Sequence, residues 1–259
     1  MNKKLGGLIF GTALSALVLS STAVQAALIT TDGSPFVYDD VLNITWLKNA
    51  NLAATETFGV AGITSNGGMN WYTANAWIGA MNDANYLGFH TWQLPTVRPL
   101  NGESFNYEAN TNGTADRGFN ISAPGTYYAG STANQLAHLF YNSLGNTGYC
   151  AIADGPVGAC IEPTPENYWE WGLVNTGPFD NMIPNRYATS VTSGIALDKA
   201  FDFDFSFGQV GTGGKGGTLY AWAVLPGQAT AVVPVPAALW LFGSGLLGMV
   251  AVGRKRRAV

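Results

Sequence analysis

Histidine and cysteine are scarce in this chain of 259 residues, which contains two of each. The sequence has no Gly-x-Ser-x-Gly nucleophile elbow and no His-Glu-x-x-His zinc motif. His138 falls on the apolar face of an expected helix and His90 in a turn beside Trp92, so structural roles are favoured for both. Because these common signatures of catalysis are missing, we expect a protein that is not an enzyme.

Basic residues are also few between the two ends of the chain. Six of the 12 Lys and Arg residues lie within residues 1–26 and 254–257, whereas all 16 Asp and Glu residues lie between these ends, giving that segment a formal charge of −10. A nucleic-acid-binding domain needs a basic surface that displaces counterions from phosphates. The charge balance therefore excludes nucleic acid as a partner, and it disfavours anionic polysaccharide unless a metal ion intervenes.

The N-terminus has the pattern of a secretory signal peptide. Lys3 and Lys4 form a basic start, residues 5–19 form an apolar core, and Val24-Gln25-Ala26 is a small-residue cleavage site. We expect cleavage after Ala26. An uncleaved anchor is the alternative, but the apolar run is short for a membrane span.

The C-terminus combines an apolar segment with a basic cluster. Residues 235–252 contain no charged residue, and as a helix they would extend roughly 27 Å, close to the thickness of a hydrocarbon core. The sequence therefore predicts one C-terminal transmembrane helix. The cations that follow would stay in the cytoplasm and place the preceding chain outside. They are Arg254, Lys255, Arg256 and Arg257.

This C-terminal region, residues 229–259, resembles the VPLPA variant of the PEP-CTERM sorting signals. The likeness rests on Val233-Pro234-Val235-Pro236, the apolar helix and the basic tail, in that order. The resemblance implies a partner, an exosortase-type membrane protease that cuts near the Pro motif, and a Gram-negative host that makes a polysaccharide matrix. We expect a protein that is anchored transiently and ends near Val233 at the cell surface or in the matrix.

The two cysteines, Cys150 and Cys160, are both expected to lie outside the cytoplasm. An even number of cysteines in an oxidising compartment favours a disulfide. A metal-binding pair is the alternative, although no His or third Cys lies nearby in sequence.

Residues 27–228 are long enough for one domain with a sizeable core. Abundant Gly, Asn and Thr and sparse charge predict a loop-rich α+β domain with antiparallel strands and two short helices. Apolar spacing predicts helices over residues 71–82, capped by Asn70, and 131–144, opened by Ser131 or Thr132. Strands are expected at residues 36–38, 44–47, 200–207 and 219–224, with the Gly-rich residues 208–218 as a hairpin-like connection.

Several segments of this domain resemble the Lcl C-terminal domain family, named for a collagen-like bacterial adhesin. They are residues 38–47, Met69-Asn70-Trp71, residues 92–96 and Ala221-Trp222-Ala223-Val224. The resemblance implies a fold akin to C-type lectins and, for the named adhesin, glycan binding. Gln93 stands where the family usually has Arg, so a forked, charge-assisted contact is missing here.

Asp202 and Asp204 alternate with phenylalanines in an expected strand. This spacing places the Phe rings on one face and both carboxylates on the other. A calcium site is one interpretation, with Asp198 as a further ligand, since calcium binds several oxygen ligands. Two like charges facing solvent are the simpler interpretation.

Aromatic residues in the loops are the clearest hint of function. Aromatic rings can stack on sugars, although they can equally fill the core of a loop-rich fold. The candidates are Tyr127, Tyr128, Tyr168, Trp169 and Trp171. The sequence thus favours a non-catalytic module for polysaccharide. A structural biofilm protein that acts by protein–protein contact is one alternative, and a carbohydrate-active enzyme using Glu166 and Glu170 is another.

Overall fold

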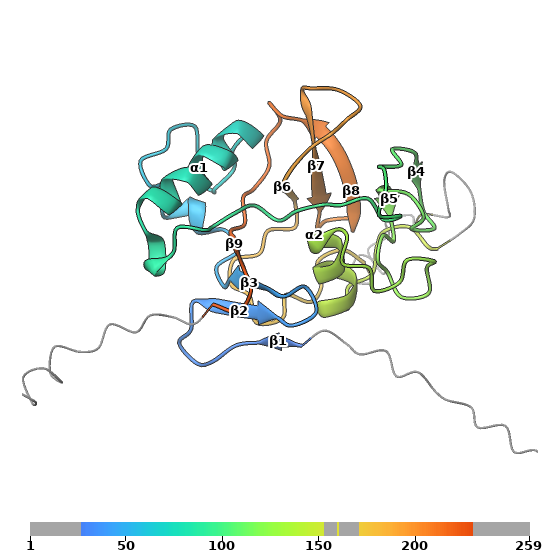
Figure 1. Ribbon diagram of the computed structural model, residues 1–259, viewed down its shortest axis with the longest axis horizontal. Coiled ribbons are helices and arrows are strands. Elements are labelled where there is room, and N and C mark those ends of the chain that lie inside the picture. The colour runs from blue at the N-terminus through green and yellow to red at the C-terminus, as the bar shows by residue number, and fades with distance from the viewer. Residues whose placement is uncertain (1–26, 153–159, 161–170, 230–259) are drawn as a thin grey trace, which may run out of the picture.

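The computed structural model describes residues 27–152, 160 and 171–229, which form a mixed α+β fold with two sheets and two short helices (Figure 1). The first sheet has the strand order β1 (Leu28–Ile29), β2 (Phe36–Asp39), β3 (Ile44–Leu47), β9 (Val224–Pro226). The second has the order β4 (Ala109–Asn110), β5 (Arg117–Phe119), β8 (Gln209–Gly214), β7 (Lys199–Asp204), β6 (Arg186–Thr192). All neighbouring strands are antiparallel except β4 and β5.

Helix α1 (Trp71–Asp83) confirms the first predicted helix and its cap. The side chain of Asn70 accepts a hydrogen bond from the Thr73 amide at 2.9 Å, satisfying one of the free N–H groups of the first turn. Trp71 Nε1 donates to the Thr189 carbonyl of β6 at 2.8 Å, and Lys215 Nζ lies 4.8 Å from the centre of the Trp71 ring. These contacts tie α1 to the second sheet.

The second helix begins four residues later than predicted. Asn134 is extended and pairs with Val97, so the chain cannot be helical before this residue. The Asn134 side chain accepts from the Ala137 amide at 3.0 Å, and α2 (Gln135–His138) continues as a π-helical segment, η3 (Leu139–Ser143). Two 3₁₀ turns complete the helices of the described ranges, η1 (Leu52–Ala54) and η2 (Tyr86–Gly88).

The first sheet brings the two ends of the described chain together. Strand β9 pairs with β3, nearly 180 residues away in sequence, and Thr45 Oγ1 donates to the Gly227 carbonyl at 2.7 Å. The Ala27 amide donates to Asp40 Oδ1, and the Ala229 amide to Thr45 Oγ1. The strand predicted at residues 219–224 is wrong, because only Val224 belongs to β9. Of the residues before it, Leu219 and Tyr220 make isolated bridges, to Met69 and Tyr187.

The second sheet corrects the predicted hairpin. Residues 208–218 are not merely a connection, because Gln209–Gly214 form strand β8, which pairs with β7 along its whole length. Strand β7 ends at Asp204 rather than at residue 207, since the Gly208 amide donates to the Asp204 carbonyl at 2.8 Å and Gly208 has a φ of +71°. The chain therefore turns directly from β7 into β8.

One aromatic cluster forms the core between the sheets. The rings of Trp46 in β3 and Trp222 lie 4.8 Å apart, and Trp222 also packs against Tyr187 of β6 at 5.7 Å. Trp222 Nε1 donates to the Leu47 carbonyl, so this side chain contacts both sheets. Within the described ranges, no helix is long and apolar enough to cross a membrane. The predicted signal peptide, the apolar helix at 235–252 and the sorting-signal residues lie outside these ranges.

Candidate functional site

The predicted loop aromatics have different surroundings. Tyr127 is 82% exposed and meets Tyr128 edge-on at 4.8 Å, so this pair stays available to a ligand. Trp171 is only 7% exposed and packs against Phe207 and Tyr149, which agrees with the alternative that these rings fill the core. Tyr168, Trp169 and the carboxylates Glu166 and Glu170 lie outside the described residues.

The predicted alternation of Phe and Asp in β7 is confirmed on its apolar side. Phe201, Phe203 and Phe205 are fully buried, whereas Phe207, which was expected on the same face, lies beyond the end of β7 and is 38% exposed. The solvent-facing interpretation of the carboxylates is wrong for Asp202, which is 3% exposed, and Asp204 is only partly exposed. Asp202 is covered because the Arg186 side chain of β6 lies against its carboxylate.

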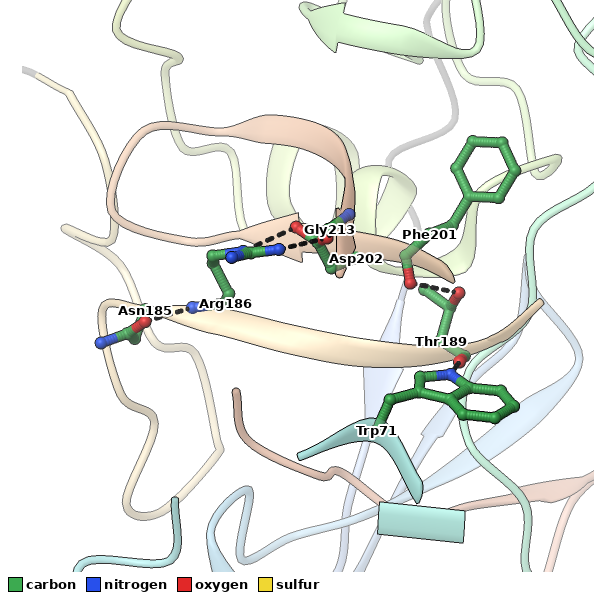
Figure 2. A network of polar contacts seen from close by, with 7 residues as sticks. All are labelled: Trp71, Asn185, Arg186, Thr189, Phe201, Asp202 and Gly213. Atoms are coloured by element: carbon green, nitrogen blue, oxygen red, sulfur yellow. Dashed lines mark hydrogen bonds and ion pairs between the residues drawn. The ribbon is translucent and has the colours of Figure 1, made fainter. Parts of the chain in front are cut away.

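Arg186 on the adjacent strand β6 binds Asp202 through a two-pronged ion pair. Arg186 Nε lies 3.0 Å from Asp202 Oδ1 and Nη2 lies 2.6 Å from Oδ2, while the Gly213 amide of β8 donates to Oδ2 at 2.8 Å. Figure 2 shows the guanidinium facing the carboxylate beside Gly213. Such forked, charge-assisted bonds fix both partners in one orientation.

Glycines of β8 make room for this ion pair. A Cβ atom at Gly213 would collide with the Arg186 guanidinium, and one at Gly211 would lie 2.7 Å from Asp202 Oδ1. Glycine normally weakens a strand, and here it lets two side chains lie flat over the backbone. The glycines that suggested a loop in the sequence are therefore needed for this face of the sheet.

A groove of about 370 Å³ lies over this face of the second sheet. Its floor includes the glycine backbone of β5 and β8, and besides Thr212 five polar side chains border it. They are Arg117, Arg186, Asp202, Asp204 and Gln209. The strand register places Gln209, Asp204 and Arg186 in one row across β8, β7 and β6, since Asp204 pairs with both of the others. Neighbouring strands are about 4.8 Å apart, so these three groups can meet one small ligand.

Several of these groups keep hydrogen-bonding capacity toward the groove. Within the described residues, Arg186 donates hydrogen bonds from Nε and Nη2, which leaves its Nη1 group available. Arg117 donates only from its Nη1 group there, to the Tyr107 carbonyl at 2.9 Å. Asp204 Oδ1 accepts from the Ser206 amide at 2.8 Å, and a carboxylate offers about four acceptor positions. The groove thus presents fixed donors and acceptors side by side.

The electrostatics of the groove follow from its partial burial. Burial raises the pKa of Asp204, and the neighbouring Asp202 charge raises it further. The hydrogen bonds from Ser206 and the charge of Arg186 lower it. The hydrogen bond to Asp202 raises the pKa of Arg186, so its guanidinium stays charged. Two cations and two carboxylates leave the groove without net formal charge.

Asp202 and Asp204, the two candidate calcium ligands, both border the groove. Both oxygens of Asp202 are engaged by Arg186 and Gly213. In the part of the chain that the structure describes, no group of three or more His, Cys, Asp or Glu side chains could hold a metal ion. Asp202 is thus ion-paired with Arg186 on this face of the sheet, and Asp204 lies beside the pair.

The remaining predicted residues serve the scaffold. Cys150 and Cys160 form the predicted disulfide. The prediction of a buried His138 is confirmed, at 2% exposed with Nδ1 3.2 Å from the Ser131 carbonyl. His90 Nδ1 lies 2.9 Å from the Asn82 carbonyl, which agrees with the predicted structural contact.

Sequence reasoning missed Arg117, Arg186 and Gln209 as members of the site. The only available signal was the alternation around Asp202, which indicated a polar sheet face without naming the strand beside it. In comparisons with known proteins, no family model, no curated protein and no solved structure matches the chain.

Proposed function

We propose that this chain is an exported, non-catalytic module that binds polysaccharide in the groove over β8. The observation that carries the proposal is the row of Gln209, Asp204 and Arg186, whose free donors and acceptors border a groove of about 370 Å³. Sugars are rich in hydroxyl groups, each of which both donates and accepts. A shallow face with mixed polar groups fits them better than it fits an apolar ligand.

The resemblance to the Lcl C-terminal domain family supports a C-type-lectin-like scaffold for this module. The segments that carry the resemblance contribute to the core, where Trp46, Trp222 and Met69 are buried. These residues pack the core, so the resemblance supports the scaffold alone. The proposed ligand is inferred from the groove.

The proposed route to the surface uses both chain ends. Signal cleavage after Ala26 and exosortase recognition of residues 229–259 would export the domain and release it near Val233 in the envelope of a Gram-negative bacterium. The hydrogen bonds of Ala27 and Ala229 to Asp40 and Thr45 support this, because both ends leave from one sheet (Figure 1). A domain tethered at one end keeps its second sheet accessible.

Affinity electrophoresis of the full-length protein in detergent, in gels containing polysaccharide, tests the proposal. We expect retardation by at least one polymer of a panel of neutral and acidic polysaccharides. No retardation by any polymer, with or without calcium, would refute the binding function. Release of new reducing ends during incubation would instead favour the enzyme.

A structural biofilm protein is the second candidate, favoured by one exposed loop. Leu197 is 93% exposed and Ile195 48% exposed between β6 and β7, and apolar side chains in such positions often meet another protein. Loss of matrix cohesion in a strain that carries Leu197→Ser, with polysaccharide binding intact, would favour this role.

A further inference from the structure

We propose that the groove over β8 takes one neutral sugar unit of the polymer and recognises it by a pair of adjacent hydroxyl groups. This inference rests on the proposed function, and it names the ligand chemistry of that site.

Charge favours a neutral ligand. Arg186 is already paired with Asp202, and Asp204 stands next to both in the same groove. An acidic sugar placed beside Asp204 would bring a third carboxylate into a site with two cations. The acidic domain around the groove, with its formal charge of −10 between the terminal signals, would repel a polyanion further.

The hydrogen-bonding groups match adjacent hydroxyls. Asp204 lies between Gln209 and Arg186 in the strand register, so one acceptor is flanked by two donors. Two neighbouring hydroxyls can both donate to the Asp204 carboxylate, while one accepts from Arg186 Nη1 and the other from the Gln209 amide. A single hydroxyl or an isolated carboxylate would leave part of this row without a partner.

The row is held in position before any ligand arrives. The Asp202 carboxylate, itself held by the Gly213 amide, fixes Arg186, and the Ser206 amide fixes Asp204. Glycine at position 211 adds no side chain to this face, so the Asp202 carboxylate that holds Arg186 can lie directly over the strand there. Little side-chain freedom is lost on binding, which favours affinity.

Periodate chemistry acts on sugar units that carry adjacent hydroxyls and leaves units without them intact. Periodate cleaves the carbon–carbon bond between two neighbouring hydroxyls, oxidising each carbon to an aldehyde while periodate is reduced to iodate, and borohydride then reduces the aldehydes to alcohols. Affinity electrophoresis of the full-length protein would use dextran, mannan, the oxidised and reduced form of each, and alginate as the acidic polymer. We expect binding to a neutral polymer that oxidation lowers at least tenfold.

Three variants assign the effect to the row. Gln209→Ala should weaken binding about fivefold, and Asp204→Asn about tenfold, because a charge-assisted bond is the stronger one. Gln228→Ala, which changes an exposed glutamine two residues after the end of β9, is the matched control and should leave binding unchanged. Since Asn can still accept from the Ser206 amide, Asp204→Asn should fold, which its unfolding curve checks.

The outcomes separate this inference from the proposed function. Binding to alginate alone, or binding to dextran that survives oxidation, would overturn the inference and leave polysaccharide binding standing. Unchanged binding in Gln209→Ala and Asp204→Asn would likewise overturn it, since the polymer would then bind elsewhere, for example at Tyr127. No binding to any polymer would overturn both.

Discussion

The two sheets of the molecule use their residues differently. All four residues of β3 in the first sheet are buried, and none carries a charge. In β8 of the second sheet, Val210 is buried against the Phe core, whereas the alternate residues Gln209, Gly211 and Gly213 lie at the groove. In the first sheet, β3 is thus covered on both faces, and the sheet joins the two ends of the described chain. The second sheet is open on one face, and this face carries the candidate site.

The largest effect is expected where the two sheets meet. Trp222→Ala removes a fully buried ring that packs on Trp46 and Tyr187 and should lower the free energy of unfolding by about 4 kcal/mol. Urea unfolding followed by fluorescence and circular dichroism measures this. Tyr72→Ala is the control, since Tyr72 is 57% exposed on α1 and should cost below about 1 kcal/mol. Equal losses in both variants would contradict a shared core.

A smaller effect is expected in the open sheet. Arg186→Leu leaves the carboxylate of Asp202 buried without its cation and should cost about 2 kcal/mol, less than for a fully buried pair because water reaches the Arg186 side chain, which is 34% exposed. The double variant Arg186→Leu/Asp202→Leu should recover part of the loss, because no buried charge is then unpaired. Urea unfolding of both variants measures the difference, and a double variant less stable than Arg186→Leu would show that the pair is not the cause.

A still smaller effect should depend on pH. Burial raises the pKa of Asp204, so its ionised form is less stable in the folded than in the unfolded chain. At neutral pH, Asp204→Asn should therefore be slightly more stable than the natural chain, by about 0.5 kcal/mol after allowance for solvent screening. This advantage should shrink as the pH falls through the raised pKa, and it should vanish below the ordinary value near 3.8. Urea unfolding between pH 3 and pH 7 measures it. If the stability of Asp204→Asn relative to the natural chain instead grew as the pH fell, the groove would be stabilising the ionised form of Asp204.

Several local features of both sheets could be predicted from the sequence alone. The strands at residues 36–38 and 44–47 were predicted correctly, because their apolar runs are short and bounded by turn residues. Asn70 likewise marked the start of α1. The Phe and Asp alternation correctly predicted an apolar and a polar face for β7. These features depend on neighbours in sequence, which a periodic pattern records.

The site itself depends on neighbours that are distant in sequence. Nothing in the pattern around Arg186 indicates that β6 pairs with β7 in the register that brings its guanidinium to Asp202. The glycines of β8 suggested a loop, because glycine favours turns unless other side chains need the space above it. Pairing and space are properties of the folded sheet, so the groove could not be found from one sequence.

The smallest predicted effect returns to the first sheet and tests how the chain is processed. The nitrogen of Ala27 lies 2.9 Å from Asp40 Oδ1, and cleavage after Ala26 would turn this amide into an α-ammonium with a typical pKa of about 7.7–8.0. In the processed protein, Asp40→Asn should cost about 0.5 kcal/mol at pH 6, as exposed ion pairs do. The pairing should raise the pKa of the ammonium in the folded state, so this stability is present below the unfolded pKa and is lost as the pH rises through the folded value. Urea unfolding at pH 6 and pH 9.5 measures the change, and mass spectrometry identifies the N-terminus. In a matched chain that retains Gln25 and Ala26, the cost of Asp40→Asn should not vary between these pH values; the same pH dependence in both chains would rule out the new terminus as its source.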